Sequence, residues 1–362
     1  MTQGKRVTIR DVAIKSGHAV STVSNALADK RHVSDETKEH VRKIAAELGY
    51  RPSTLARALR MRLSSTIGVL VADVGNPATP EFIRGVDDVA VREGCTILLC
   101  NTDDQESRQI SQMETLLDRQ VDGMILISQH VDSPAVRRLL DKVPFVLVQR
   151  RSSRFRDDYV GSDNHGGTAA TVEHLVGLGH RRIGFVTGPS SSSTALERLE
   201  AYETSIAAQG CDSDPELVFR GDYSRSAGYR AMEYFVSLAA PPTAIIASND
   251  VNALGILDAA NDLGLRIPQD MSLVGCDDIE IASLRRIDLT TLTLPKRDMG
   301  AAATELLLRR IHAKRAVLPR EVIMPTKMNI RGSAAAPREQ ASLPPLATTP
   351  GLRDPALLES GS

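Results

Sequence analysis

Cysteine is scarce in this chain of 362 residues, and its placement excludes a disulfide framework. The four cysteines, Cys95, Cys100, Cys211 and Cys276, form no C-x-x-C pair. Each lies in or beside an apolar run, where cysteine packs as a small hydrophobic residue. We therefore expect a reducing compartment.

Long apolar runs are missing as well. The first residues, MTQGKRVTIRDVA, contain no apolar core of a secretory signal, and no later run approaches the length of a membrane span. The sequence therefore predicts a cytoplasmic protein with no membrane partner.

Signatures of catalysis are also absent. The chain has neither a G-x-x-x-x-G-K-[ST] loop nor an H-E-x-x-H helix. The eight histidines are scattered, and His174 and His180 are six residues apart, so they would not share a helix face. We expect no enzyme activity, no cofactor and no metal site.

Charge is distributed unevenly, although the whole chain has a net charge of only −1. Residues 1–65 hold 13 lysines and arginines against 6 acids, a net of +7, which leaves −8 on the rest. A basic segment joined to an acidic body indicates a module that binds a polyanion. A merely solvated basic surface explains the charge equally well.

The first fifty residues predict three short helices. Thr8 can cap a helix that ends at Gly17, a second helix covers about 20–28, and a third begins after Ser34 and ends at Gly49. A helix, a tight turn with glycine and a second helix form the helix-turn-helix pattern.

From Ile67 onward, short apolar strands alternate with amphipathic helices, which predicts an α/β fold with parallel sheets. Two similar sets suggest two lobes with one layout. The stretch 289–294 and a helix over 298–313 are expected to return to the first lobe. The predicted strands cover residues 67–72, 96–100, 123–128 and 145–149, then 182–187, 217–221, 244–248 and 272–276.

These patterns divide the chain into four parts. We expect a helix-turn-helix domain over 1–52, a hinge helix and linker over 53–64, and a two-lobed domain over 65–332. Repeated prolines and small residues from Ser333 predict a disordered tail over 333–362.

The chain resembles one family along most of its length, from about residue 7 to residue 331. The matching segments are TIRDVA at 8–13, STVSN at 21–25, VSDET at 33–37, AELGYRP at 46–52, ARAL at 56–59, GHRRIG at 179–184, ND at 249–250, IP at 267–268, SLVGCDD at 272–278 and LTT at 289–291. In this order and spacing they resemble the lac-repressor/gal-repressor family of bacterial transcription regulators. The resemblance implies a head piece, a hinge helix and a two-lobed sensor like a periplasmic sugar-binding protein. It also implies a homodimer that binds a two-fold symmetric DNA operator and a small-molecule effector.

The second helix of a helix-turn-helix enters the major groove with its amino-terminal residues at base edges. Here those residues are Val20, Ser21 and Asn25, whose side chains offer methyl groups, a hydroxyl and an amide. Core packing of Val20 and a solvated Asn25 are the alternatives, and Val23 is expected in the core. Candidates for phosphate contacts are Thr8, Thr22, Ser24, Arg31 and Ser34.

Two departures from the family pattern affect the head and the ligand site. His18-Ala19 stands where the family usually has Val-Ser, and alanine cannot cap the recognition helix. His18 is expected to be a half-buried turn residue or a phosphate contact. Asn76-Pro77 is not followed by the aromatic residues of many relatives, and Phe82 or Tyr223 would have to replace that stacking surface.

The segment 53–60 is too short to hold a helix alone. In the family it folds into paired hinge helices on the operator, and the leucine at the position of Leu59 wedges into the minor groove. Arg57 and Arg60 flank it and can follow the phosphates. Packing of Leu59 against the sensor is the alternative.

The resemblance places the effector in the cleft between the lobes, in loops that follow parallel strands. Arg198 with Asp277 and Asn249 combines a donor fork with acceptors, which suits a sugar, while a small acid or a nucleoside stays open. A surface ion pair of Arg198 and a strand-end cap by Asp277 are the alternatives. The proposed effector residues are Asp73, Asn76, Thr79, Ser192, Thr194, Arg198, Tyr223, Asn249 and Asp277.

Two other classes of protein share parts of this pattern. A transport-type binding protein would have the two-lobed body, but the basic head and the missing signal argue against it. An α/β enzyme with an extension lacks the motifs named above. The tail contains Pro344, Pro345, Pro350 and Pro355, which exclude the leucine heptad helix of tetrameric relatives, so we expect a dimer.

Overall fold

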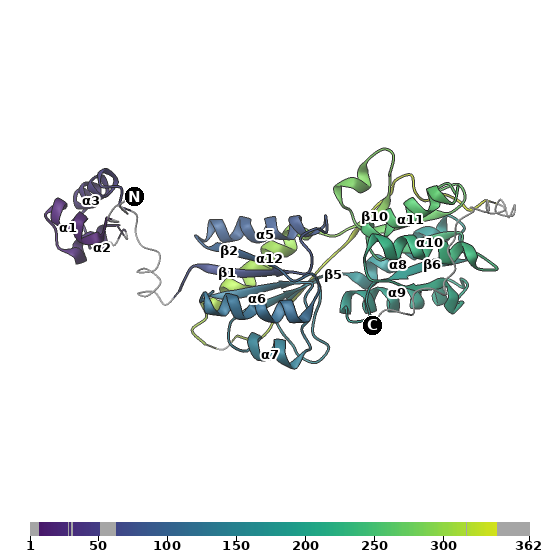
Figure 1. The fold of residues 1–362 in the computed structure, drawn as a ribbon, viewed down its shortest axis with the longest axis horizontal. Coiled ribbons are helices and arrows are strands. Elements are labelled where there is room, and N and C mark those ends of the chain that lie inside the picture. Colours follow the sequence, from purple (N-terminus) through teal and green to yellow (C-terminus); the bar gives the residue numbers. More distant parts are fainter. Residues whose placement is uncertain (1–6, 28, 30–31, 51–62, 316, 339–362) are drawn as a thin grey trace, which may run out of the picture. The chain divides into compact units, whose positions relative to one another are not determined.

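The computed structural model describes residues 7–27, 29, 32–50, 63–315 and 317–338 (Figure 1). The chain divides into two compact units, Met1–Ser65 and Thr66–Ser362, referred to below as the head and the body. Within the described ranges, no helix combines the length and the apolar character that a bilayer crossing requires.

The described part of the head contains helices α1 (Ile9–Ser16), α2 (Val20–Leu27) and α3 (Asp35–Glu47). The backbone N–H of Thr8 donates to Asp11 Oδ2 at 2.7 Å, and the hydroxyl of Ser34 accepts from the backbone N–H of Thr37. Gly17 turns the chain between α1 and α2 at φ +70°, a conformation that favours glycine. The apolar core of the head joins the three helices and contains Val12, Ala13, Val23, Ala26, Val41, Ile44 and Ala45.

The first lobe of the body is a six-stranded parallel sheet in the order β11-β5-β4-β3-β1-β2. Its strands are β1 (Thr66–Val71), β2 (Thr96–Asn101), β3 (Gly123–Ile127), β4 (Phe145–Val148), β5 (Tyr159–Ser162) and β11 (Glu321–Met324). Helices α5 (Thr79–Arg92) and α12 (Lys296–Ile311) cover one face, and α6 (Glu106–Asp118) and α7 (Pro134–Leu140) cover the other (Figure 1).

The second lobe has the corresponding strand order, β12-β10-β9-β8-β6-β7, but its last strand, β12, runs antiparallel to β10. Its strands are β6 (Ile183–Thr187), β7 (Val218–Arg220), β8 (Ala244–Ala247), β9 (Ser272–Asp277), β10 (Thr290–Thr293) and β12 (Lys327–Asn329). Helices α8 (Asn164–Gly177) and α9 (Ser193–Ala208) cover one face, and α10 (Arg225–Ser237) and α11 (Asp250–Asp262) cover the other. Short 3-10 helices lie at Pro215–Leu217 and Glu280–Ser283.

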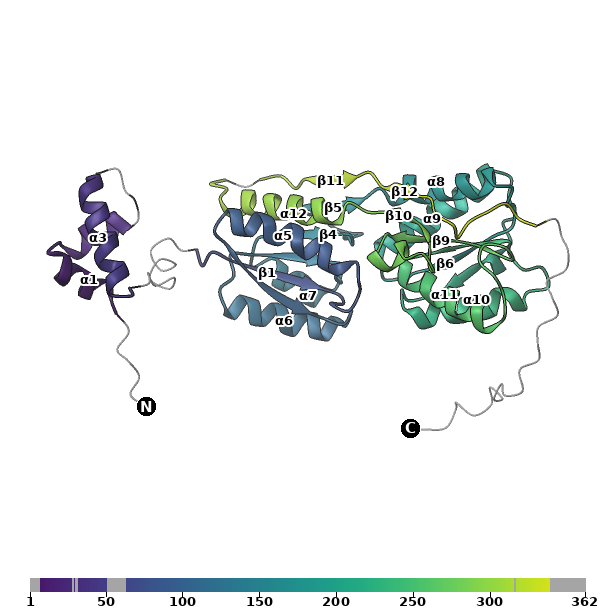
Figure 2. The same ribbon diagram turned by 90° about the horizontal axis from the view of Figure 1, so that it is seen from above.

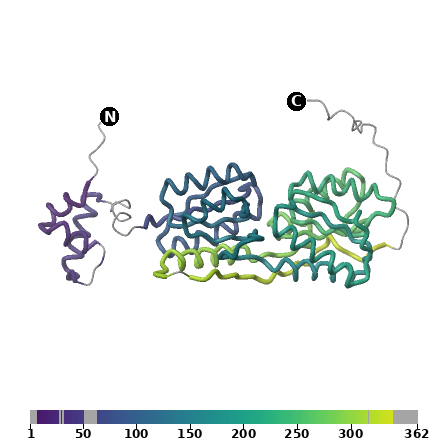
Figure 3. The backbone as a smooth tube through the Cα atoms, turned by 90° about the horizontal axis from the view of Figure 1, so that it is seen from below, coloured from purple at the N-terminus to yellow at the C-terminus, as the bar shows by residue number. Residues whose placement is uncertain are grey.

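Three crossings connect the lobes: from β5 to α8, from β10 to α12 and from β11 to β12 (Figures 2 and 3). In the first sheet β1 lies between β2 and β3, and in the second sheet β6 lies between β7 and β8, so the chain changes direction across each sheet at that point. Doubly wound folds bind ligands at this point. The eight strands expected in the two sets are all present, and the two-lobed α/β fold is confirmed.

The expected return of residues 289–294 to the first lobe is wrong, because β10 pairs with β9 in the second lobe. Thr290 and Thr291 are buried there, and the hydroxyl of Thr291 donates to Asp250 at 2.6 Å. The helix that follows, α12, does pack on α5 of the first lobe.

Residues 333–338, which were expected in a disordered tail, are packed against the second lobe. Ser333 is only 2% exposed, and its hydroxyl donates to the carbonyl of Leu273 at 2.6 Å. The carbonyl of Ala335 accepts from His180 Nε2 at 2.9 Å, and Arg338 pairs with Asp270. Residues 333–338 therefore belong to the packed body, because their backbone and hydroxyl groups complete hydrogen bonds of the second sheet.

Candidate functional site

In the head, helix α2 has one side buried in the core and one side accessible to solvent. Val23 and Ala26 are fully buried, whereas Val20 is 42% exposed and Ser21 is exposed beside it. Core packing of Val20 is thus not what the structure shows. Three further small polar residues of α2, Thr22, Ser24 and Asn25, are half-buried. The accessible side of α2 therefore combines methyl, hydroxyl and amide groups, which suits contact with base edges.

Two of the expected phosphate contacts outside α2 are among the described residues. Both lie at helix amino ends. Thr8 precedes α1 and Ser34 precedes α3, and both side chains are exposed. Helix amino ends attract phosphate because of their free backbone N–H groups. Arg31, Arg57, Leu59 and Arg60, with the hinge-helix prediction, lie outside the described residues.

The turn before α2 contains His18, whose ring packs on a second histidine ring. The carbonyl of Ala19 accepts the first helical hydrogen bond, from the backbone of Val23 at 3.0 Å. The ring of His18 lies edge-on to the ring of His40 in α3, with centroids 6.0 Å apart. His18 is therefore a half-buried turn residue packed on α3.

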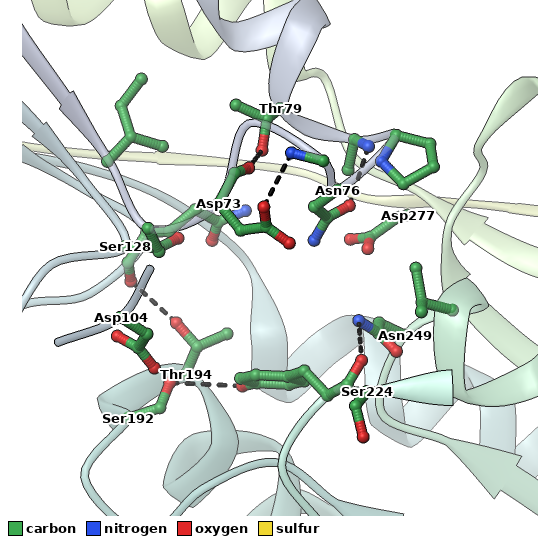
Figure 4. Close-up of a pocket in the computed structure, with 18 of the residues that line it drawn as sticks. Asp73, Asn76, Thr79, Asp104, Ser128, Ser192, Thr194, Ser224, Asn249 and Asp277 are labelled. Atoms are coloured by element: carbon green, nitrogen blue, oxygen red, sulfur yellow. Dashed lines mark hydrogen bonds between the residues drawn. The ribbon is translucent and has the colours of Figure 1, made fainter. Parts of the chain in front are cut away.

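A cavity of about 560 Å³ lies in the body where loops from the carboxyl ends of both sheets meet. We refer to it as the interlobe cavity. All nine residues proposed from the sequence line it, and Figure 4 shows labelled side chains from both lobes around its open centre. The residues lie at or after the carboxyl ends of β1, β6, β7, β8 and β9, in the loops and in the first turns of the helices α5 and α9, because parallel strands end on one side of their sheet.

Arg198 and Asp277 form the charged centre of this cavity. Arg198 is 6% exposed, its Nε donates to Asn164 Oδ1 at 3.0 Å, and its Nη1 donates to the carbonyl of Ser248 at 2.6 Å. The alternative of a surface ion pair is therefore wrong. Asp277 is 8% exposed, and burial raises its carboxyl pKa against the opposing charges of Arg198 and Lys296.

The carboxylate of Asp277 has no hydrogen-bond partner among the described side chains and backbone groups. The amine of Lys296 donates to the backbone carbonyl of Asp277 and not to its carboxylate. A cap on the strand end is therefore not the role of this side chain. A buried acceptor that faces a cavity can bind a hydroxyl or N–H group of a ligand.

A second charged group on the cavity wall was missed from the sequence. Arg150, 5% exposed, donates from both guanidinium ends to Asp104 at 2.6 and 3.0 Å, and His130 Nε2 lies 3.3 Å from the same carboxylate. Although burial opposes it, these hydrogen bonds and charges lower the pKa of Asp104 to about 2. Hydrogen bonding to Asp104 raises the pKa of His130. The positions of Asp104 and Arg150 after β2 and β4 were the available signal.

Several cavity residues hold backbone conformations that L-residues rarely adopt. Ser128, Gln149, Tyr223 and Asp277 have φ values of +57°, +69°, +68° and +121°. Strain of this kind at the ends of strands is typical of binding sites, where it directs side chains into a cavity.

Two aromatic residues, Phe82 and Tyr223, are among those that line the cavity. They are the two that the sequence offered in place of the missing aromatics after Pro77. The Tyr223 hydroxyl lies 3.2 Å from Ser192 Oγ, and burial raises the pKa of Tyr223. Its ring edge leaves no room for a side chain at Gly188, whose Cβ would lie 2.2 Å from Tyr223 Cζ.

The cavity contains more acids than bases. Five aspartates and three arginines line it, and each arginine already holds a protein acceptor: Arg150 on Asp104, Arg198 on Asn164 and Ser248, and Arg225 on Asp258. No cluster of three metal-binding side chains occurs among the described residues. The cavity therefore suits a neutral ligand with several hydroxyl groups better than an anion.

Comparisons with known proteins match both units. A family model described as bacterial regulatory proteins, lacI family, matches residues 8–53, and one described as a periplasmic binding protein-like domain matches residues 172–334. The ribose operon repressor of Escherichia coli K12 is 33% identical over 330 residues, which cover 90% of this chain and 99% of that protein.

The HTH-type transcriptional repressor PurR of Aliivibrio salmonicida is 32% identical over 310 residues, 85% of this chain and 93% of that protein. Among solved structures, the lac repressor dimer bound to operator and the anti-inducer ONPF is similar, with a TM-score of 0.81 and 28% identity. The match covers 92% of this chain and 100% of that one.

Proposed function

The chain belongs to the lacI family of bacterial regulatory proteins, and we propose that a neutral, polyhydroxylated metabolite in the interlobe cavity controls its attachment to an operator. The protein is a DNA-binding transcriptional repressor of that family, with a sensor domain like a periplasmic binding protein. We assign it no catalytic activity of its own and place it in the cytoplasm, with the chromosome.

One observation carries the ligand assignment: the buried Asp277 carboxylate faces the cavity beside Arg198 without a hydrogen-bond partner among the described residues. A sugar or nucleoside hydroxyl would donate to Asp277 and accept from Arg198. Burial of a charged acceptor is unfavourable until such a partner arrives. The ligand therefore contributes the missing hydrogen bond, and Tyr223 offers a ring for stacking.

The charge balance favours a neutral ligand over the small acid that the sequence alone left open. A carboxylate or phosphate needs a cation without a carboxylate partner, and Arg150 and Arg225 are paired with Asp104 and Asp258, while the charge of Arg198 faces the Asp277 carboxylate. Five aspartates would also repel an anion.

On the DNA side, we propose that α2 reads one half-site of a two-fold symmetric operator in a homodimer. Val20, Ser21 and Asn25 would meet base edges, and Thr8, Thr22, Ser24, Arg31 and Ser34 would contact phosphates. We also keep the wedge proposal for Leu59 with Arg57 and Arg60, which rests on the sequence resemblance.

The test of the ligand proposal is thermal unfolding of the full chain with D-ribose, D-glucose, adenosine and ribose 5-phosphate, each at millimolar concentration. A ligand at 100 times its Kd stabilises the folded state by about 2.7 kcal/mol. We expect a rise in melting temperature with a neutral compound and none with the phosphate. A rise with the phosphate alone would contradict the proposal.

Asp277→Asn tests the residue that carries the argument. Loss of a charged acceptor removes about 1.5–3 kcal/mol of binding, which weakens the affinity for the neutral ligand about ten- to hundred-fold. DNA binding without ligand should persist. Asp87→Asn, on the exposed face of α5, is the matched control and should respond like the wild type. An unchanged response of Asp277→Asn would remove Asp277 from the site.

A further inference from the structure

A basic groove lies on the first lobe at the amino ends of its strands, opposite the interlobe cavity. Two adjoining depressions, which share Pro319, form it from the end of α12, from the start of β4 and from the loops before β5 and β11. We refer to it as the amino-edge groove. Because the strands of the first sheet are parallel, this edge holds their amino ends, and the cavity lies at their carboxyl ends.

The charge of this groove is opposite to that of the body around it. Eight lysines and arginines line it with three aspartates, a net of +5, although residues 66–362 together have a net charge of −8. Local charge of this density on an acidic body indicates a polyanionic partner.

The three acids are already neutralised within the groove. Arg137 donates to both oxygens of Asp157 at 2.9 and 2.8 Å and lies 3.4 Å from Asp141. Asp158 is fully buried and accepts from Arg310 Nε at 2.5 Å.

Five exposed cations of the groove have no acidic partner in the described part of the chain: Lys142, Arg156, Lys314, Arg315 and Arg320. Two nitrogens of Arg309, which also lines the groove, are buried without a hydrogen bond, although Nη2 lies 3.6 Å from Asp158.

The position of the groove relates it to the DNA-binding unit. The linker joins the body at Thr66, the amino end of β1, on this same side, and Figure 2 shows the end of α12 at that end of the lobe. β4 lies two strands from β1 and β11 lies four strands away, about 10 and 19 Å at the usual strand spacing.

We propose that the amino-edge groove binds the phosphate backbone of the DNA held by the head. It would be a second, sequence-independent DNA contact, made by the sensor. The groove crosses the ends of three neighbouring strands, and a duplex presents one charge per about 1.7 Å of its axis, so more than one phosphate can enter it. The proposal rests on the DNA-binding function of the family.

The test is the salt dependence of DNA binding by the full chain. Fluorescence anisotropy with a labelled 40-base-pair duplex of random sequence gives the association constant between 50 and 200 mM KCl. Each phosphate contact contributes about 0.9 to the slope of log K against log salt. Lys314→Ala/Arg315→Ala should therefore lower that slope by about 1–2 and weaken binding about ten-fold or more at 100 mM KCl.

The control removes the same charge elsewhere. Arg220→Ala/Arg230→Ala changes two exposed arginines of the second lobe and should leave the slope at its wild-type value. Lys314→Glu/Arg315→Glu should weaken binding further than the alanine pair, with an unchanged melting temperature. A wild-type slope in the Lys314/Arg315 variants would overturn the proposal, as would an equal loss in the control. A wild-type chain that binds no duplex would overturn the DNA-binding function itself.

Discussion

Asp250 illustrates how a single buried residue can set the pH response of the sensor. It begins α11, is fully buried, and its two carboxylate oxygens accept from Thr291 Oγ1 at 2.6 Å and from the backbone of Ile279 at 2.9 Å. Burial, together with the nearby charge of Asp277, raises the pKa of Asp250 to about 7. An unfolded aspartate titrates near 3.9, so between these values the folded chain holds a proton that the unfolded chain has lost.

We therefore expect the stability contribution of Asp250 to be full below pH 4 and to be lost as the pH rises through 7. The loss is on the order of a few kcal/mol, since one pKa unit corresponds to about 1.36 kcal/mol. Asp250→Asn removes this titration and can keep both contacts, with the Thr291 hydroxyl accepting instead of donating. Urea unfolding at pH 5 and pH 8 should show the wild type losing more stability than the variant; parallel losses would contradict the assignment.

The Asn variant is also the control for other buried groups. His174 and His180 have pKa values lowered by burial, so their stability contributions change in the opposite direction, rising from pH 5 to 7. They are common to both proteins and cancel in the comparison.

At this scale the sequence could place the cavity residues but not all of their interactions. Arg198, Asn249 and Asp277 follow strands that end at one sheet edge, so their meeting was predictable from the pattern. The pairing of Arg150 with Asp104 was not, because it depends on backbone turns at positive φ near Asp103, Asp104 and Gln149. Arg150 is paired with Asp104, whereas Arg198 lies beside the Asp277 carboxylate, which has no partner among the described residues. This difference depends on how the chain packs, so the sequence pattern does not predict it.

Pairs of helices in each lobe cross at glycine, and this feature explains part of the repeated layout. A Cβ at Gly85 of α5 would lie 1.9 Å from the carbonyl oxygen of Arg297 in α12, and one at Gly300 would lie 2.1 Å from that of Phe82. In the second lobe, Gly228 of α10 and Gly255 of α11 meet in the same way. Backbone approaches this close exclude any side chain at the crossing.

Gly85→Ala should therefore destabilise the body by about 1–3 kcal/mol or more, the usual effect of overpacking, because backbone atoms and not a flexible side chain must move. Gly177→Ala in α8 is the matched control. Its added methyl group meets nothing within 4 Å, so higher helix propensity should leave stability unchanged or raise it by up to about 1 kcal/mol. Urea unfolding of both variants checks this; equal stability of the two would show that α5 and α12 can separate without loss.

Elements with a strong apolar pattern were predictable, and weak edge elements were not. The eight strands expected in the two sets are present, whereas the edge strands β11 and β12 are short, contain only exposed and half-buried residues, and gave no clear signal. The buried strand β5, between β4 and β11, was also not expected, because it has only four residues, two of them Gly161 and Ser162. β10 was expected as a strand but placed in the wrong lobe, because an apolar run does not say which sheet will pair with it. That choice depends on β9 and on the buried Asp250–Thr291 contact.

The whole molecule has to read DNA with one short helix in each head. Helix α2 has eight residues and is about 12 Å long, enough to face only a few base pairs. Two copies related by two-fold symmetry read two half-sites one helical turn apart, which doubles the sequence that is recognised. The function of the family thus favours a dimer over a monomer.

The body offers a surface for such a dimer at the edge of its first sheet. β2 is the edge strand, and Leu99 on β2 and Val91 at the end of α5 are 45% and 67% exposed. Proteins usually cover exposed apolar residues at an unpaired sheet edge with another element or another chain. We expect light scattering to give about twice the 39.2 kDa of one chain, and the same ratio for a chain that ends at Arg338. Leu99→Asp should shift the mass towards one chain, whereas Leu196→Asp, at a leucine of similar exposure on α9, should not. A tetramer, or a Leu99 variant that stays dimeric, would place the interface elsewhere.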